Sequence, residues 1–140
     1  MMIVDDYVPF RRAVKDMLSE QLSSAKIVEA GNSQEVLRQL TPFPPDLVFM
    51  DIRLGHENGL TLTRMIKANY PDTTVAILTS YDLPQYREAA IQSGASGYIY
   101  KSSVELGGIS TMGKCFEKAK NEGRQKPICV RLATECPSKG

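Results

Sequence analysis

One short stretch, Leu47-Val48-Phe49-Met50-Asp51, constrains the fold more than any other part of the sequence. Four consecutive apolar residues are typical of a strand that is buried on both faces, as in a parallel sheet covered by helices. This strand is expected over residues 46–51 and ends on a carboxylate. A loop rich in turn-forming residues follows it and leads into a helical pattern. Because open α/β sheets bind ligands beyond the carboxyl ends of their strands, Asp51 is a candidate site residue.

The rest of the chain alternates short apolar runs with amphipathic segments. Strands are expected over residues 1–4, 26–30, 46–51, 75–79 and 98–100, and helices over residues 9–23, 33–40, 60–70 and 84–93. This alternation predicts an α/β fold in which a parallel sheet carries helices on both faces. Residues 1–106 are expected to form this core as one domain.

The pattern weakens after the last expected strand. Gly107, Gly108 and Gly113 interrupt the next helix, and an interior glycine costs up to about 1 kcal/mol relative to alanine. Residues 107–123 are therefore predicted to form a short or frayed fifth helix, followed by an irregular basic tail over residues 124–140. Residues 114–140 carry seven Lys and Arg against three Asp and Glu. Such a segment is more often solvated than bound to nucleic acid, so direct nucleic-acid binding by this chain is not expected.

Polar side chains stand at the carboxyl ends of the long strands: Asp5 and Asp6, Asp51, Thr79 and Lys101. The carboxyl ends of parallel strands share one edge of the sheet, so these groups are expected to converge. Three neighbouring carboxylates repel one another and require a cation, and Mg²⁺ fits because it binds carboxylates, water and phosphate. An ammonium and a hydroxyl suit the phosphate, and a carboxylate can accept a phosphoryl group. The residues predict a Mg²⁺-dependent aspartyl-phosphate site.

The order of these strand-end residues resembles the receiver domain of bacterial response regulators over residues 1–106. The segment Met50-Asp51-Ile52-Arg53-Leu54, with Gly59 beyond it, is similar in particular to the receivers of LuxR-type transcriptional regulators. The segment Gly97-Tyr98-Ile99-Tyr100-Lys101 shares this similarity. The resemblance implies a doubly wound five-stranded parallel sheet of the flavodoxin/CheY-like kind, with strand order 2-1-3-4-5. It also implies a part in two-component signal transduction and in the regulation of transcription.

The resemblance further implies which residues hold the metal and accept the phosphoryl group. Asp51 is the implied phosphoacceptor. Asp6 and Asp51 are implied ligands of Mg²⁺, and the backbone carbonyl of Arg53 is the implied third ligand. Asp5 is expected to act on the metal largely through water. The phosphoryl group would come from a histidine kinase, so the chain is not expected to be an enzyme.

A second set of implied roles concerns the phosphate and the response to it. Thr79 and Lys101 are expected to hold the phosphoryl oxygens. Tyr98 matches the switch aromatic, which turns inward when Thr79 moves toward the phosphate. The output face would then be built from the fourth helix, the fifth strand and the fifth helix, and would contact an output domain or a partner protein. The implied partner upstream is a cognate histidine kinase, and homodimerisation stays open.

Three features depart from the family pattern. Ser102 replaces the proline that commonly follows the lysine, and Gly55 stands where a proline is frequent in the loop after the phosphoacceptor, which is expected to loosen that loop. After Ser103, the sequence lacks the length and apolar periodicity of a helix-turn-helix domain. The chain is therefore expected to be either a stand-alone receiver or one whose output domain was lost or cut away.

The sequence is also compatible with two other classes of function, which its residues favour less. A pseudo-receiver or protein-interaction module that phosphorylation does not control stays open, because the irregular C-terminal part would belong to the output face. A phosphatase with an aspartate nucleophile is disfavoured, because the acid expected two residues after the nucleophile is replaced by Arg53. Taken singly, an Asp-Asp pair before a helix can simply cap it. Only the combination of all five strand-end residues favours the receiver site.

Cysteine and hydropathy patterns limit the compartment. The three cysteines, Cys115, Cys129 and Cys136, form no C-x-x-C pair, and the only histidine, His56, lies far away in the sequence. A structural zinc site is therefore not expected, and unpaired thiols suit a reducing compartment. No apolar run reaches the length of a membrane span. A cytoplasmic location without membrane contact is expected.

Overall fold

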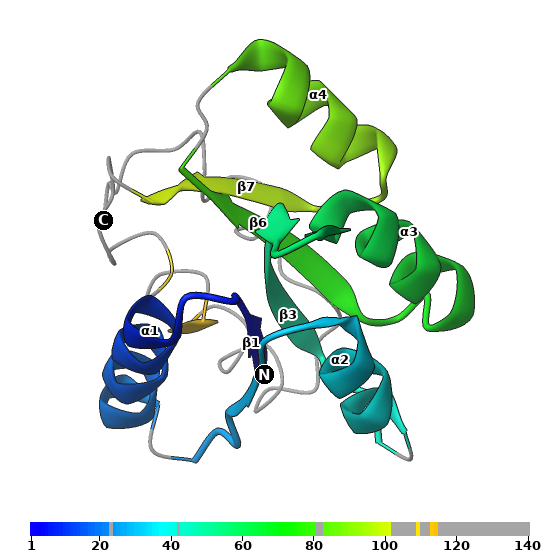
Figure 1. Cartoon of the computed structure of the whole chain (residues 1–140). Helices are drawn as coiled ribbons and strands as arrows, with labels where there is room; N and C mark the ends of the chain where they lie inside the picture. The colour runs from blue at the N-terminus through cyan, green and yellow to red at the C-terminus, as the bar shows by residue number, and fades with distance from the viewer. Residues whose placement is uncertain (23, 42, 81–82, 102–108, 110–112, 115–140) are drawn as a thin grey trace.

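The computed structural model describes residues 1–22, 24–41, 43–80, 83–101, 109 and 113–114 (Figure 1). Its strands are β1 (Met2–Val4), β2 (Val28–Ala30), β3 (Leu47–Asp51), β4 (Arg53–Leu54), β5 (Glu57–Asn58), β6 (Thr74–Thr79) and β7 (Gly97–Tyr100). Its helices are α1 (Val8–Gln21), α2 (Ser33–Leu40), α3 (Gly59–Asn69) and α4 (Pro84–Gln92). No helix in these described residues is long and apolar enough to cross a membrane.

Five parallel strands form one sheet in the order β2-β1-β3-β6-β7 (Figure 1). The register aligns Val4 with Met50, Met50 with Ile77, and Ile77 with Tyr98. The predicted doubly wound sheet with strand order 2-1-3-4-5 is therefore confirmed. The chain winds one way from β1 to β2 and the other way from β3 onward, so the topological switch point lies at the carboxyl ends of β1 and β3.

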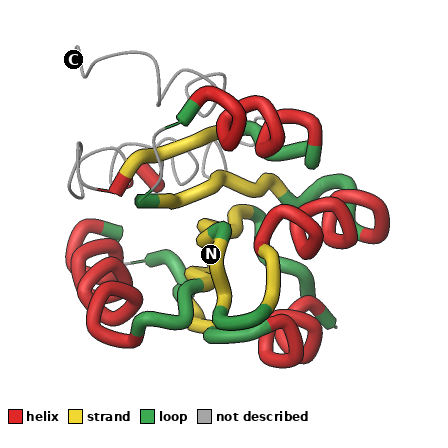
Figure 2. Tube along the Cα trace, turned by 45° about the horizontal axis from the view of Figure 1, so that its top comes forward, coloured by secondary structure: helices red, strands yellow, loops and turns green. Residues whose placement is uncertain are grey.

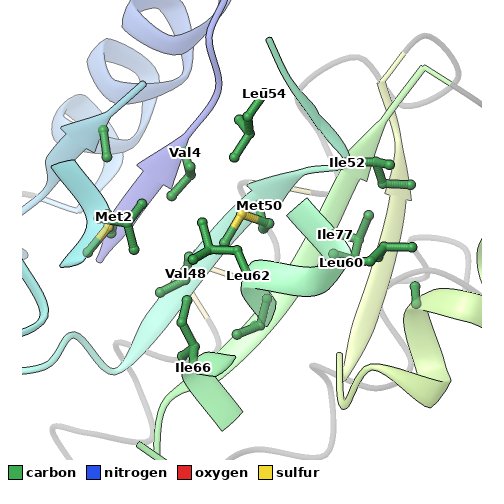
Figure 3. Close-up of a cluster of buried hydrophobic side chains, with 14 of the residues drawn as sticks. Met2, Val4, Val48, Met50, Ile52, Leu54, Leu60, Leu62, Ile66 and Ile77 are labelled. Carbon is green, nitrogen blue, oxygen red and sulfur yellow. The ribbon is translucent and has the colours of Figure 1, made fainter. Parts of the chain in front are cut away.

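The two faces of the sheet bury separate apolar clusters, because alternate residues of each strand point to opposite faces. On one face, Val48 and Met50 of β3 pack with residues of α2, α3 and α4 (Figure 3). On the other face, Leu47 and Phe49 pack with α1. Figure 2 shows α1 on one side of the sheet and the other three helices on the opposite side. All five β3 residues are buried, as expected for an apolar run in a parallel sheet.

Local sequence signals explain where the helices begin. Pro9 and Pro84 lie in the first turns of α1 and α4, where a missing N–H costs nothing. Asn32 caps α2 by accepting a hydrogen bond from the Glu35 backbone N–H at 2.9 Å. Asn58 caps α3 in the same way, through the Leu60 N–H at 2.7 Å. The second of these caps fixes the helix that follows the Asp51 loop.

Most elements differ from the sequence prediction by one or two residues at their boundaries, and one loop contains a pair of strands that was not predicted. The second strand starts at Val28 rather than at residue 26, because its pairing with β1 starts at Met2 and Val28. The loop after Asp51 contains a short antiparallel hairpin, β4 and β5, that the sequence analysis treated as irregular. A two-residue turn at Gly55 and His56 joins these strands, and Gly55 adopts a φ of 64°.

The predicted fifth helix and basic tail lie outside the described residues, apart from Ile109, Gly113 and Lys114. Ile109 belongs to the apolar cluster under α1. A Cβ added to Gly113 would lie 3.0 Å from Leu18 and 3.1 Å from Leu22, so this glycine sits directly against α1. Close packing against α1 thus explains why a glycine stands at position 113, although glycine lowers the helical propensity of this segment.

Candidate functional site

Three carboxylates meet at the switch point of the sheet. Asp5 and Asp6 directly follow β1, and Asp51 is the last residue of β3. Each offers a carboxylate oxygen within 4.8 Å of the others. Asp5 and Asp51 are buried, with relative exposures of 1% and 9%, whereas Asp6 is exposed. The cluster is therefore open to solvent on the Asp6 side and could hold a cation with oxygen ligands.

Lys101 brings one positive charge to this cluster. It directly follows β7, and its Nζ lies 2.7 Å from Asp5 Oδ2 and 3.4 Å from Asp51 Oδ2. The same Nζ lies 4.4 Å from the centroid of the Phe10 ring on α1. Among the described residues, the ammonium of Lys101 faces three carboxylates, so this part of the site has an excess of acidic groups. The position of Lys101 at the end of a strand predicts its approach to the carboxylates, but no sequence pattern predicts its contact with Phe10.

Asp51 is the group whose protonation this environment changes most clearly. Its burial, and next the negative charge of Asp5, raise the pKa of Asp51 from 3.8 to about 7, although Lys101 opposes the change. Near neutral pH and without a cation, the Asp51 carboxyl is thus partly protonated. A cation bound between the carboxylates would favour its ionised form.

One backbone donor and two side-chain donors hold Asp5 in place. Its Oδ1 accepts a hydrogen bond from the Tyr7 N–H at 2.9 Å, while Oδ2 accepts the one from Lys101. Its carbonyl oxygen accepts a hydrogen bond from Arg11 Nη1 at 2.8 Å. Arg11 also donates from Nε to Glu29 Oε1 on β2 at 2.7 Å, and this bond lowers the pKa of Glu29. Arg11, which the sequence analysis did not single out, therefore ties the turn after β1 to the neighbouring strand.

Two glycines shape the loop that follows Asp51. The Gly55 N–H donates to Asp6 Oδ2 at 2.9 Å, a bond that a proline at this position could not make. Gly59 N–H donates to the Ile52 carbonyl oxygen at 2.6 Å. A Cβ on Gly59 would lie only 1.9 Å from the Asp51 carbonyl oxygen, so this position has no room for any side chain. The loop is thus packed directly against the backbone of Asp51.

The remaining expected site residues lie as follows. Thr79 ends β6 at the same edge of the sheet, one residue beyond Leu78, which pairs with Asp51. Its side chain is fully buried. Tyr98 on β7 is also buried, at 4% exposure, and packs in the cluster under α4. The guanidinium of Arg87 on α4 lies 5.0 Å from the Tyr98 ring centroid.

Arg53 begins β4, two residues after Asp51, and is exposed. The structure therefore brings Asp5, Asp6, Asp51 and Lys101 into direct proximity and places Thr79 at the same edge. Tyr98 lies one strand further along, on the face covered by α4. Sequence reasoning missed Phe10 and Arg11, because their contacts join helix α1 to residues on other elements.

Comparisons with known proteins agree with this geometry. Residues 1–107 match the family model for the response regulator receiver domain. Over 99 residues, covering 71% of this chain and 46% of the relative, the sequence is 35% identical to the DNA-binding transcriptional activator DevR/DosR of Mycobacterium tuberculosis. This chain covers between 43% and 49% of the length of the first curated relatives it matches.

Solved structures give the same match. A LuxR-family two-component response regulator from Aurantimonas sp. SI85-9A1 superposes with a TM-score of 0.72 at 25% identity, over 95% of this chain and 92% of that chain. A CheY-like receiver domain protein from Methanospirillum hungatei JF-1 superposes with a TM-score of 0.73 at 20% identity, over 87% of this chain and 96% of that chain. The second likeness concerns the fold alone.

Proposed function

Because this chain belongs to the response regulator receiver family, we propose that it accepts a phosphoryl group on Asp51 in two-component signal transduction. One observation carries the proposal: the carboxylates of Asp5, Asp6 and Asp51 and the ammonium of Lys101 converge at one edge of the sheet. This set contains a nucleophile, oxygen ligands for a cation and a positive charge for the phosphoryl oxygens.

We propose that Asp51 attacks the phosphorus atom through a carboxylate oxygen. The bond between phosphorus and the donor's leaving atom breaks, and the leaving atom keeps the electron pair; an imidazole nitrogen then takes a proton from water, whereas acetate leaves as the anion. Lys101 is close enough to both Asp5 and Asp51 to turn its ammonium toward the new phosphoryl oxygens. Thr79, at the end of the neighbouring strand, is the proposed second partner of these oxygens. Bound Mg²⁺ would supply positive charge that neutralises the transferred group.

The proposed Mg²⁺ ligands are Asp6, Asp51 and the backbone carbonyl of Arg53, with Asp5 acting through water. The donor set fits the ion, because Mg²⁺ prefers oxygen ligands and keeps several waters. Both carboxylate oxygens of Asp5 already accept hydrogen bonds, from Tyr7 and from Lys101, which supports its indirect role. Asp6 is exposed, so water and a phosphodonor can reach the ion from that side.

Receiver domains interact with histidine kinases, and we propose that a cognate histidine kinase is the phosphodonor and that this chain acts in the cytoplasm. Tyr98 is the proposed switch residue, and its contact with Arg87 links it to α4 on the proposed output face. Residues 1–106 would form the receiver core, with a fifth helix over 107–123 and a basic tail over 124–140. The relative DevR/DosR is a DNA-binding transcriptional activator. We therefore propose that the output, through a partner, an output domain or a homodimer, regulates transcription.

The direct test measures the intact mass of the protein after incubation with Mg²⁺ and acetyl phosphate. One added phosphoryl mass is expected in the wild type, and none in EDTA or in an Asp51→Asn variant. Asp16→Asn, which changes an exposed carboxylate on α1, is the matched control and should be phosphorylated normally. A folded wild type that gains no phosphoryl mass and does not bind beryllofluoride would instead support a phosphate-independent interaction module.

A further inference from the structure

The hairpin formed by β4 and β5 lies between the candidate site and helix α2. Its register pairs Arg53 with Asn58 and Leu54 with Glu57, and its turn consists of Gly55 and His56. A two-stranded hairpin alone is marginally stable in water, so its position depends on what anchors it. Leu54 is 2% exposed and packs in the core, which anchors one side.

Glu57 anchors the other side of the hairpin to α2. Its Oε1 accepts a hydrogen bond from the Ser33 backbone N–H at 2.8 Å, and its Oε2 accepts one from the Ser33 hydroxyl at 2.5 Å. Ser33 is the first residue of α2, where backbone N–H groups lack partners inside the helix and the helix dipole favours a negative charge. Both bonds lower the pKa of Glu57, so they favour its ionised form.

The turn of the hairpin, which the Leu54–Glu57 pair closes, contacts the acidic cluster. The Gly55 N–H donates to Asp6 Oδ2 at 2.9 Å. Asp6 is a proposed metal ligand, and a hydrogen bond to one carboxylate oxygen orients the other. Arg53, whose carbonyl is the proposed third ligand, lies on the strand paired with the one that carries Glu57. The geometry thus links Ser33, Glu57, the hairpin turn and Asp6 in one chain of contacts.

We propose that Glu57 is a positioning residue for the metal site: by binding both Ser33 donors, it holds the hairpin so that Gly55 orients Asp6. This inference rests on the proposed function, because it assumes that Asp6 ligates Mg²⁺. Glu57 itself does not contact the metal. The glycine at position 55, where a proline is frequent in the family, allows this role, since only a residue with a backbone N–H can donate to Asp6.

The test uses the whole chain without a phosphodonor and compares the wild type with Glu57→Ala, Glu57→Gln and Ser33→Ala. The first readout is the Gly55 amide proton shift in metal-free protein, which reports the bond to Asp6. The second is the Mg²⁺ dissociation constant from calorimetry. In Glu57→Ala, the hairpin loses its bonds to Ser33, and the Gly55 N–H no longer orients Asp6. The loss of this one bond to Asp6 should weaken Mg²⁺ binding about five-fold. The Gly55 proton should move upfield in the same variant.

Charge must be separated from position, because Glu57→Ala also removes a negative charge near the cation. Glu57→Gln removes the charge but keeps an oxygen for Ser33, whereas Ser33→Ala keeps the charge and removes a donor. Positioning predicts that the weakening persists in high salt, which screens charges but not local geometry. Glu20→Ala, an exposed glutamate at the far end of α1, is the control and should change neither readout.

The outcomes distinguish the two proposals. Suppose that the wild type binds Mg²⁺ and that Glu57→Ala shows the same Gly55 amide proton shift and the same Mg²⁺ dissociation constant. This result would overturn the positioning role but would not contradict the proposed function. The positioning role would also be overturned if Glu57→Ala and Glu57→Gln bound Mg²⁺ equally weakly and both regained wild-type affinity in high salt. The lost negative charge alone would then explain the weaker binding. A folded wild type without saturable Mg²⁺ binding would overturn both proposals.

Discussion

Replacing Asp51 by asparagine should stabilise the metal-free protein at neutral and alkaline pH. Burial and the charge of Asp5 raise the pKa of Asp51 from 3.8 to about 7, so the folded state disfavours the ionised carboxyl. Asparagine is close to the protonated carboxyl in shape and carries no charge. The variant therefore removes an unfavourable charge from the folded state while keeping the volume of the side chain.

The magnitude follows from the linkage between proton binding and folding. Below pH 3.8, both the folded and the unfolded chain bind the Asp51 proton, so the group has no effect on stability. Between pH 3.8 and about 7, only the folded chain keeps it, so stability falls as the pH rises. The full shift corresponds to about 4 kcal/mol above pH 7. Relaxation of the protein and water near the carboxylate reduce the free-energy cost of ionising Asp51 in the folded state. We therefore expect Asp51→Asn to be about 2 kcal/mol more stable than the wild type at pH 8.

The assay is urea unfolding followed by circular dichroism at pH 5 and pH 8 in EDTA. The stability gap between variant and wild type should be larger at pH 8 than at pH 5. Excess Mg²⁺ should narrow it, because a cation favours ionised Asp51 in the wild type. Asp16→Asn is the control and should show no such gap. A gap that does not change with pH, or a variant that is less stable than the wild type at pH 8, would refute the reasoning.

Three further predictions follow from the same contacts. Binding of Mg²⁺ should compete with the Asp51 proton, so calorimetry should find about ten-fold weaker binding at pH 6 than at pH 8; equal affinities would contradict the raised pKa. Gly59→Ala would place a methyl group against the Asp51 carbonyl, so urea unfolding should show a loss of about 3 kcal/mol or more, whereas wild-type stability would disprove the close approach. Phe10→Leu should lose about 0.5–1 kcal/mol through the cation–π contact with Lys101, and a double-mutant cycle with Lys101→Met should recover this as coupling energy; a zero coupling would show that the ring acts only by packing.

The sheet and the acidic cluster could be predicted because they follow from local patterns and one topological rule. Apolar runs such as Leu47–Met50 fixed the strands, and parallel pairing brings the residues after them to one edge. Asp5, Asp51 and Lys101 were therefore expected to meet, and their carboxylate and ammonium groups do meet. The resemblance to receivers supplied the strand order, which the residues alone had left open.

The contacts that hold the cluster in place could not be predicted in this way. Arg11 bonds to the Asp5 carbonyl and to Glu29, and Glu57 bonds to Ser33 across 24 positions of the sequence. Long polar side chains reach many places from one backbone position, so no periodicity marks these pairs. The family pattern predicts only that Gly55 loosens its loop, whereas in the structure the Gly55 N–H donates a hydrogen bond to Asp6.

The position of Lys101 suggests how phosphorylation of Asp51 would change the structure outside the site, at strand β7. The ammonium lies closer to Asp5 than to Asp51, at 2.7 Å against 3.4 Å, and the Phe10 ring limits its position from α1. Phosphorylation replaces the singly charged Asp51 carboxylate by an acyl phosphate that carries about two negative charges. Lys101 would then move toward Asp51, and its bond to the buried Asp5 would weaken. A hydrated cation could offset the negative charge that remains on Asp5. Because Lys101 directly follows β7, which carries Tyr98, that movement would pull on the strand that carries the proposed switch residue.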